Sequence, residues 1–171
     1  MLKALIASVF FLLASAAIAN EEFEHPFFKA ISGEWTGEGG LTNADGEVSE
    51  LSESWTAEAN DAGGFEFSGI RELSDQTQEF RWIFSYNVAT ESFESEYWHT
   101  GMEDPIRFEV SLTDDRADMV LYGGDSGGEI RVTNSLSDGG MESVVSVKDG
   151  NGQEVMGGTV NHIRVKSSDP E

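Results

Sequence analysis

The chain has 171 residues, no cysteine, and 32 acidic against 10 basic side chains, which gives a net charge of −22. This charge argues against binding to nucleic acid or to anionic membranes, because such binding needs a basic stripe that the sequence lacks. Eleven Phe, four Trp and three Tyr residues argue against a disordered acidic chain, since disordered chains are poor in aromatic residues. We therefore expect a folded domain that is stabilised by packing and hydrogen bonds, without disulfides.

Residues 1–19 have the three-part pattern of a secretory signal peptide. Lys3 supplies the positive start, residues 4–13 form an apolar run, and Ala17-Ile18-Ala19 forms a small-x-small cleavage site. The run is too short to favour the alternative, a retained membrane-spanning helix. We expect a bacterial-type exported protein, periplasmic or secreted, whose residues 20–171 form one domain with no membrane insertion after signal removal.

One short helix is predicted before the rest of the domain. The candidate is 24–31, where Pro26 suits a first turn and where Phe27 and Ile31 share a face. From Ser32 onward, apolar and polar residues alternate in short segments, which clusters of Gly, Asp and Asn interrupt. The pattern predicts strands near 32–42, 47–59, 64–73, 78–88, 91–99, 104–113, 116–123, 128–136, 140–148 and 154–166.

The number of strands favours a closed barrel. Hairpin connections should pair each strand with its neighbour in sequence, and closure would remove the two unpaired edges of an open sheet. The predicted fold is therefore an all-β, single up-and-down antiparallel β-barrel of about ten strands, with a β-sandwich as the alternative. A ten-stranded barrel is wide enough for an interior cavity, unless large aromatic side chains or the N-terminal helix fill it.

Two stretches of the sequence carry a resemblance to a known superfamily. A short helix followed by Gly33-Glu34-Trp35 resembles the start of the calycins, which include lipocalins, fatty-acid-binding proteins and nitrobindins. The longer string 33–39 is more similar to nitrobindin and to an uncharacterised family of secreted bacterial barrels. The stretch Phe84-Ser85-Tyr86-Asn87, with Thr90 after it, is similar to the Tyr-Asp-x-x-Thr pattern of that uncharacterised family, although Asn87 replaces the Asp.

The resemblance implies roles for three residues. In calycins the Trp of this motif packs at the closed end of the barrel under a basic side chain, which implies a structural pair of Trp35 and Arg164. The nitrobindin likeness implies haem as a possible cofactor, with His162 as its axial ligand and His99 as a second candidate. The haem ligand would require Val160, His162 and Arg164 to point inward; if Ile163 points inward instead, His162 faces solvent.

Several residues lie on strand faces that could line a cavity, and they form the predicted ligand site: Trp55, Phe67, Arg71, Trp82, Phe84, Tyr86, Tyr97 and His99. An apolar pocket with a few convergent polar groups is the usual form of a small-molecule site. A buried Arg71 must be paired or must meet an anionic ligand. Three readings of Arg71 stay open: a bridge to Glu53, a contact with a ligand carboxylate, or a position at a solvent-exposed rim.

The sequence predicts neither catalytic residues nor a protein-held metal ion. The string Gly124-Asp125-Ser126-Gly127-Gly128 matches the surroundings of a trypsin-like serine, but no histidine lies in a matching context, so we interpret it as a hairpin. The leading hypothesis is a calycin-like protein that binds a small amphipathic or apolar molecule. The alternatives are a haem or tetrapyrrole carrier, a barrel that serves only as a scaffold, and an enzyme that acts inside the barrel.

Overall fold

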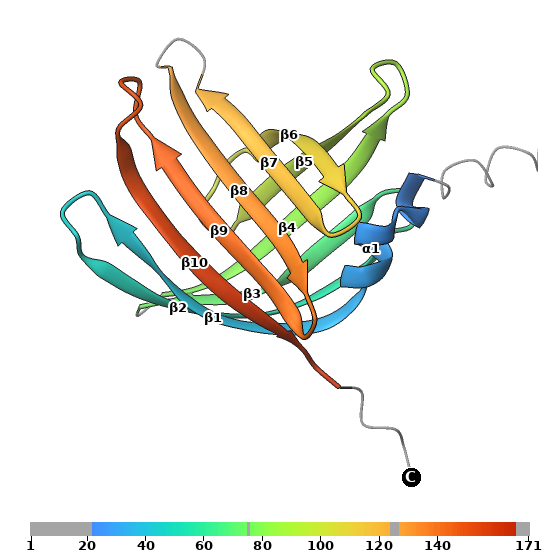
Figure 1. Cartoon of the computed structure of the whole chain (residues 1–171), viewed down its shortest axis with the longest axis horizontal. Coiled ribbons are helices and arrows are strands. Elements are labelled where there is room, and N and C mark those ends of the chain that lie inside the picture. Colours follow the sequence, from blue (N-terminus) through green and yellow to red (C-terminus); the bar gives the residue numbers. More distant parts are fainter. Residues whose placement is uncertain (1–21, 75, 124–126, 167–171) are drawn as a thin grey trace, which may run out of the picture.

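A closed ten-stranded barrel makes up nearly all of the structure (Figure 1). The computed structural model describes residues 22–74, 76–123 and 127–166, so the signal-like segment 1–19 and residues 124–126 of the predicted hairpin lie outside the described residues. The strands are β1 (Gly33–Asn43), β2 (Val48–Ala59), β3 (Phe65–Leu73), β4 (Gln76–Asn87), β5 (Ser92–His99), β6 (Ile106–Thr113), β7 (Arg116–Gly123), β8 (Gly128–Ser137), β9 (Gly140–Lys148) and β10 (Glu154–Arg164). A 3₁₀ turn, η1 (Glu22–Glu24), and a helix, α1 (Pro26–Ile31), precede them.

Each strand pairs antiparallel with its neighbours in sequence, and β1 pairs with β10 to close the barrel. The closing register runs from Trp35 opposite Arg164 to Asn43 opposite Met156. A side chain at Gly39 would place its Cβ 2.0 Å from the carbonyl oxygen of Thr159, so this close approach of β1 to β10 requires glycine. The predicted up-and-down barrel is confirmed, and the alternative sandwich is wrong, because the first and last strands pair with each other.

Helix α1 lies across one end of the barrel, while the β1–β2 and β9–β10 hairpins lie at the other end (Figure 1). Phe27, Phe28 and Ile31 of the helix are fully buried. The Phe28 ring lies 4.8 Å from that of Phe65 and 5.5 Å from that of Phe84, between ring centroids. The apolar face of this one short helix therefore fills the barrel end. No helix in the described ranges is both long and apolar enough to cross a membrane.

Trp35 connects the helix to the barrel wall. Its indole Nε1 donates a 2.7 Å hydrogen bond to the carbonyl oxygen of Ile31, and its ring stacks on Trp55 at 5.5 Å. The guanidinium of Arg164 lies 4.7 Å from the centre of the Trp35 ring, and it also donates hydrogen bonds to the carbonyl oxygens of Ala30 and Ser32. The pair that the calycin resemblance implies is thus present, and it holds the end of α1 in place.

Ser95 of β5 carries a buried hydroxyl without a hydrogen-bond partner in the described structure. Its neighbours across the sheet are Phe84 and Phe108, whose side chains have no atom that accepts a conventional hydrogen bond. Since an unsatisfied buried hydroxyl is costly, we expect Ser95→Ala to leave the free energy of unfolding unchanged or to raise it by about 1 kcal/mol. Urea denaturation would measure this, with the exposed Ser85→Ala as the control. A loss of more than 1 kcal/mol would show that the hydroxyl has a stabilising role.

Candidate functional site

Inside the barrel lies a cavity of about 330 Å³, between the aromatic residues packed on α1 and the opposite, hairpin end. Its volume is within the usual range for small-molecule sites. The lining is mostly apolar, and it consists of Leu41, Leu51, Glu53, Trp55, Phe67, Arg71, Leu73, Gln78, Phe80, Trp82, Tyr97, His99, Ile106, Phe108, Ile130, Val132, Asn134, Met141, Ser143, Val145, Val147, Met156, Val160 and His162. The lining residues come from β1 to β6 and from β8 to β10.

The structure brings together six of the eight residues predicted to form the ligand site. Trp55, Phe67, Arg71, Trp82, Tyr97 and His99 all line the cavity. Four of their aromatic rings are in contact in two pairs: Trp55 stacks on Phe67 at 5.4 Å, and Trp82 lies 4.6 Å from Tyr97. Aromatic residues therefore form a continuous part of the cavity wall.

Phe84 and Tyr86 do not line the cavity, so the prediction for these two residues needs correction. The ring of Phe84 is fully buried against Phe28 and Phe67, in the part of the barrel that α1 fills. Tyr86 lies one step further toward the helix end, where its ring packs against Phe93 at 5.0 Å. Alternation of side chains along β4 places both residues on the same strand face as Trp82. It does not show how far along the barrel the aromatic side chains that pack on α1 extend.

Four polar side chains in the cavity wall are connected by hydrogen bonds. We call these residues, Glu53, Arg71, Tyr97 and His162, the polar cluster. Glu53 Oε2 accepts a 2.9 Å hydrogen bond from Arg71 Nε and lies 2.9 Å from Arg71 Nη2 in an ion pair, while Oε1 accepts from His162 Nε2 at 2.7 Å. Arg71 Nη1 in turn donates to the Tyr97 hydroxyl at 3.0 Å. Of the three readings of Arg71, the structure contains the bridge to Glu53.

His162 points inward and is only 2% exposed. Its Nδ1 lies 3.3 Å from the carbonyl oxygen of Met141, and its ring packs edge-on against Trp55 at 5.5 Å. A side chain at Gly37 would place its Cβ 2.3 Å from the imidazole, so the glycine on β1 makes room for the ring. The backbone of β1 and the aromatic wall together fix the direction in which His162 presents Nε2 to Glu53.

The surroundings of His162 do not fit an axial haem ligand. Both ring nitrogens already face protein groups, and Nε2 would have to leave Glu53 before it could bind iron. The other candidate, His99, is half-buried and has Nδ1 2.8 Å from the carbonyl oxygen of Thr100. Across the described ranges no three His, Cys, Asp or Glu side chains form a group that could hold a metal ion.

Ser143 and Asn134 form a second polar pair in the wall. The Ser143 hydroxyl donates to Asn134 Oδ1 at 2.6 Å, while Nδ1 of His162 lies 3.5 Å from the same hydroxyl oxygen. Since the serine proton is directed at Asn134, His162 is not arranged as its general base. Sequence reasoning placed Ser143 on the face shared by Met141, Val145 and Val147 but did not select it; nothing in the sequence singled out Asn134.

The polar cluster shifts the pKa values of its own members. Burial favours a higher pKa for Glu53, but the hydrogen bond from His162 and the charge of Arg71 outweigh it and hold the pKa below its ordinary value. Burial also favours a lower pKa for Arg71, which the carboxylate of Glu53 reverses, so the net direction is upward. Burial raises the pKa of Tyr97 despite the nearby guanidinium. At neutral pH the cluster therefore holds a carboxylate, a guanidinium and a protonated phenol.

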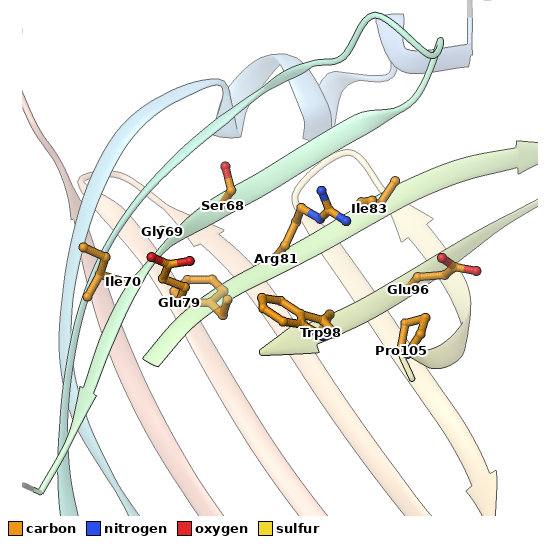
Figure 2. Close-up of a pocket in the computed structure, with 10 residues that line it drawn as sticks. Ser68, Gly69, Ile70, Glu79, Arg81, Ile83, Glu96, Trp98 and Pro105 are labelled. Atoms are coloured by element: carbon orange, nitrogen blue, oxygen red, sulfur yellow. The ribbon is translucent and has the colours of Figure 1, made fainter. Parts of the chain in front are cut away.

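A larger groove, of about 610 Å³, lies on the outer face of the barrel (Figure 2). Figure 2 shows Ser68, Ile70, Glu79, Arg81 and Trp98 along it, on three neighbouring strands, β3, β4 and β5. These side chains alternate with the buried ones of the same strands, so the groove runs between side chains on the solvent side. The interior cavity is the better candidate site, because strands from most of the barrel line it and apolar side chains dominate its lining.

Comparisons with known proteins show the fold and no family. No protein-family model matches the chain, and no curated protein matches it. Among solved structures, an S-type phycobiliprotein lyase, CPES, from Guillardia theta has a TM-score of 0.57 at 12% identity, covering 83% of this chain and 92% of that one. A DUF3598-family protein of unknown function from Nostoc punctiforme has a TM-score of 0.53 at 14% identity; 81% of this chain is covered, but only 49% of that protein. At these identities the likeness shows a shared barrel fold alone.

Proposed function

We propose that this protein binds a small amphipathic or apolar molecule inside its barrel. The observation that carries the proposal is the cavity of about 330 Å³ inside the barrel, whose wall combines aliphatic and aromatic side chains with one polar cluster. Apolar walls supply most of the binding free energy of such sites, and a few fixed polar groups orient the ligand. The ion pair of Arg71 and Glu53, whose side chains are 21% and 7% exposed, gives the wall such a fixed group.

We also propose that the protein is exported, to the periplasm or beyond the cell, and that it is calycin-like. Export is supported by the signal-peptide pattern of residues 1–19. The calycin likeness is supported by Gly33-Glu34-Trp35 at the start of the first strand, by the packing of Trp35 under Arg164, and by the closed barrel. An extracytoplasmic carrier or sensor of a small molecule is the function that these features favour.

Filling the cavity tests the proposal against the scaffold alternative. Val145 lines the cavity, whereas the adjacent Val144 faces solvent and is 38% exposed. Naphthalene is a suitable probe, because it is apolar, compact and unable to form conventional hydrogen bonds. We expect calorimetric titration to detect naphthalene binding to the wild type and to Val144→Trp, and to detect at least about a tenfold weaker affinity for Val145→Trp.

The outcome separates the two functions. If all three proteins bind naphthalene equally, the probe binds outside the barrel, and the cavity is not the site. If none of the three proteins binds naphthalene, and none binds the linear ketone nonan-2-one, the scaffold alternative is favoured. Thermal unfolding of each variant provides the necessary control for folding, since a tryptophan inside the wall also tests how well the barrel tolerates overpacking.

A further inference from the structure

We infer that the cavity prefers a neutral hydrogen-bond acceptor, such as the carbonyl group of a ketone or ester, over the carboxylate of a fatty acid. This inference rests on the proposed function and specifies the polar end of the ligand. Two properties of the wall support it: the hydrogen-bonding capacity that its polar side chains leave unused, and the balance of charge within the polar cluster.

The strongest acceptor in the cavity wall is already occupied. Glu53 receives hydrogen bonds from Arg71 on one carboxylate oxygen and from His162 on the other, at 2.7 to 2.9 Å. Its side chain is only 7% exposed. A ligand that offered a proton to Glu53 would have to displace one of these charge-assisted partners, which are about twice as strong as neutral hydrogen bonds. The cluster is therefore a poor partner for a donor group.

Unused donors lie in the same wall, those of Tyr97 and Asn134 among them. The Tyr97 hydroxyl accepts from Arg71, and its own proton has no acceptor in the part of the chain that the structure describes. Asn134 accepts from Ser143 through Oδ1, and its amide N–H groups have no acceptor among the described residues. Both residues line the cavity. A ligand oxygen that accepts from either group would pair a donor that the wall leaves unpaired, which is worth more than a contact with an already satisfied one.

The charge balance then distinguishes a neutral acceptor from an anionic one. The carboxylate of Glu53 compensates the guanidinium of Arg71 in a direct ion pair. The charges of Glu53 and Arg71 cancel, so a ligand carboxylate would add to a mostly apolar cavity a negative charge that neither residue is free to compensate. An unpaired buried charge is far more costly than a buried carbonyl group that receives a hydrogen bond. A ketone or ester oxygen therefore fits where a carboxylate does not.

The direct test compares two probes of equal chain length, nonan-2-one and nonanoate, at pH 8.5, where the acid is fully ionised. We expect isothermal titration calorimetry of the protein to show that the ketone binds at least about ten times more tightly than the acid. An equal or higher affinity for nonanoate would overturn the inference but leave the proposed function intact. A failure of naphthalene and of both chain probes to bind would overturn the proposed function itself.

A matched pair of tyrosine variants tests the donor. Tyr97→Phe removes the unused proton and keeps the ring against Trp82, whereas Tyr86→Phe makes the same change outside the cavity. We expect Tyr97→Phe to weaken nonan-2-one binding about threefold to tenfold and to affect naphthalene binding clearly less. Tyr86→Phe should change neither. Equal ketone affinities for the wild type and Tyr97→Phe would contradict the role given to this hydroxyl.

A change at Glu53 tests the charge argument, because it leaves the guanidinium of Arg71 without its counter-charge. We expect Glu53→Gln to reverse the preference, so that nonanoate binds more tightly than nonan-2-one, while Glu109→Gln on the outer face leaves the wild-type order. An unchanged preference in a folded Glu53→Gln protein would contradict the charge argument. If this variant does not fold, the wild-type probe comparison and the tyrosine pair still decide the inference.

Discussion

Replacing Glu53 with alanine is expected to lower the free energy of unfolding by about 3–5 kcal/mol, because it leaves buried charged and polar partners without their acceptor. Arg71 loses the oxygen that two of its nitrogens share, and His162 loses its 2.7 Å partner. Urea denaturation monitored by circular dichroism measures the loss. The matched control is Glu109→Ala, whose exposed carboxylate points away from the cavity, and its cost should stay within about 0.5 kcal/mol.

The same pair of measurements has a pH dependence with a defined sign. The pKa of Glu53 lies below its ordinary value in the folded protein, so ionised Glu53 stabilises the fold at pH values above that ordinary value. This contribution is lost as the pH falls through the folded pKa. The stability difference between wild type and Glu53→Ala should therefore be largest near neutral pH and shrink below about pH 4.5. A difference that grows on acidification would contradict the ion-paired state of Glu53.

Replacing Trp35 with alanine is expected to cost about 3–5 kcal/mol, the range for removing a buried tryptophan. The change removes three interactions together: the hydrogen bond to Ile31, the stack on Trp55 and the contact with Arg164. It also opens a void where α1 meets the barrel wall, so the helix should lose protection from amide hydrogen exchange before the strands do.

The control for Trp35 is a tryptophan on the opposite face of the sheet. Trp98 lies in the outer groove and is partly exposed, so Trp98→Ala should cost clearly less than Trp35→Ala. Equal losses for the two variants would show that the barrel end does not depend on the packing of α1. A Trp35→Phe variant separates the contribution of ring packing from that of the hydrogen bond, because it keeps an aromatic ring against Trp55 but loses the hydrogen bond to Ile31.

The barrel could be predicted from the sequence because its strands have a strong period of two and clear turn residues. The predicted strand at 116–123 matches β7 (Arg116–Gly123), and the predicted strand at 140–148 matches β9 (Gly140–Lys148). Closure followed from the cost of unpaired edges, and the structure pairs β1 with β10 accordingly. The inward face of a strand could also be predicted where large aromatic residues alternate with charged ones, as they do around Trp82.

The sequence could not predict how deeply α1 and the aromatic side chains packed on it fill the barrel end, because this depends on how far a short helix reaches into the barrel. Phe84 and Tyr86 share a strand face with Trp82, but only Trp82 lies beyond the aromatic residues that pack on α1. The link from Glu53 to His162 was equally inaccessible, since it joins residues 109 positions apart through the closing strands. Register across a barrel closure decides such contacts, and no local pattern encodes it.

A crystal structure of the protein grown with nonan-2-one would test the central claim most directly. We predict electron density for the ketone within the barrel, among Trp55, Phe67 and Trp82, with its oxygen within hydrogen-bonding distance of Tyr97 or Asn134. A barrel whose side chains fill the interior, or a ketone bound only in the outer groove along Ile70 and Trp98, would contradict the claim.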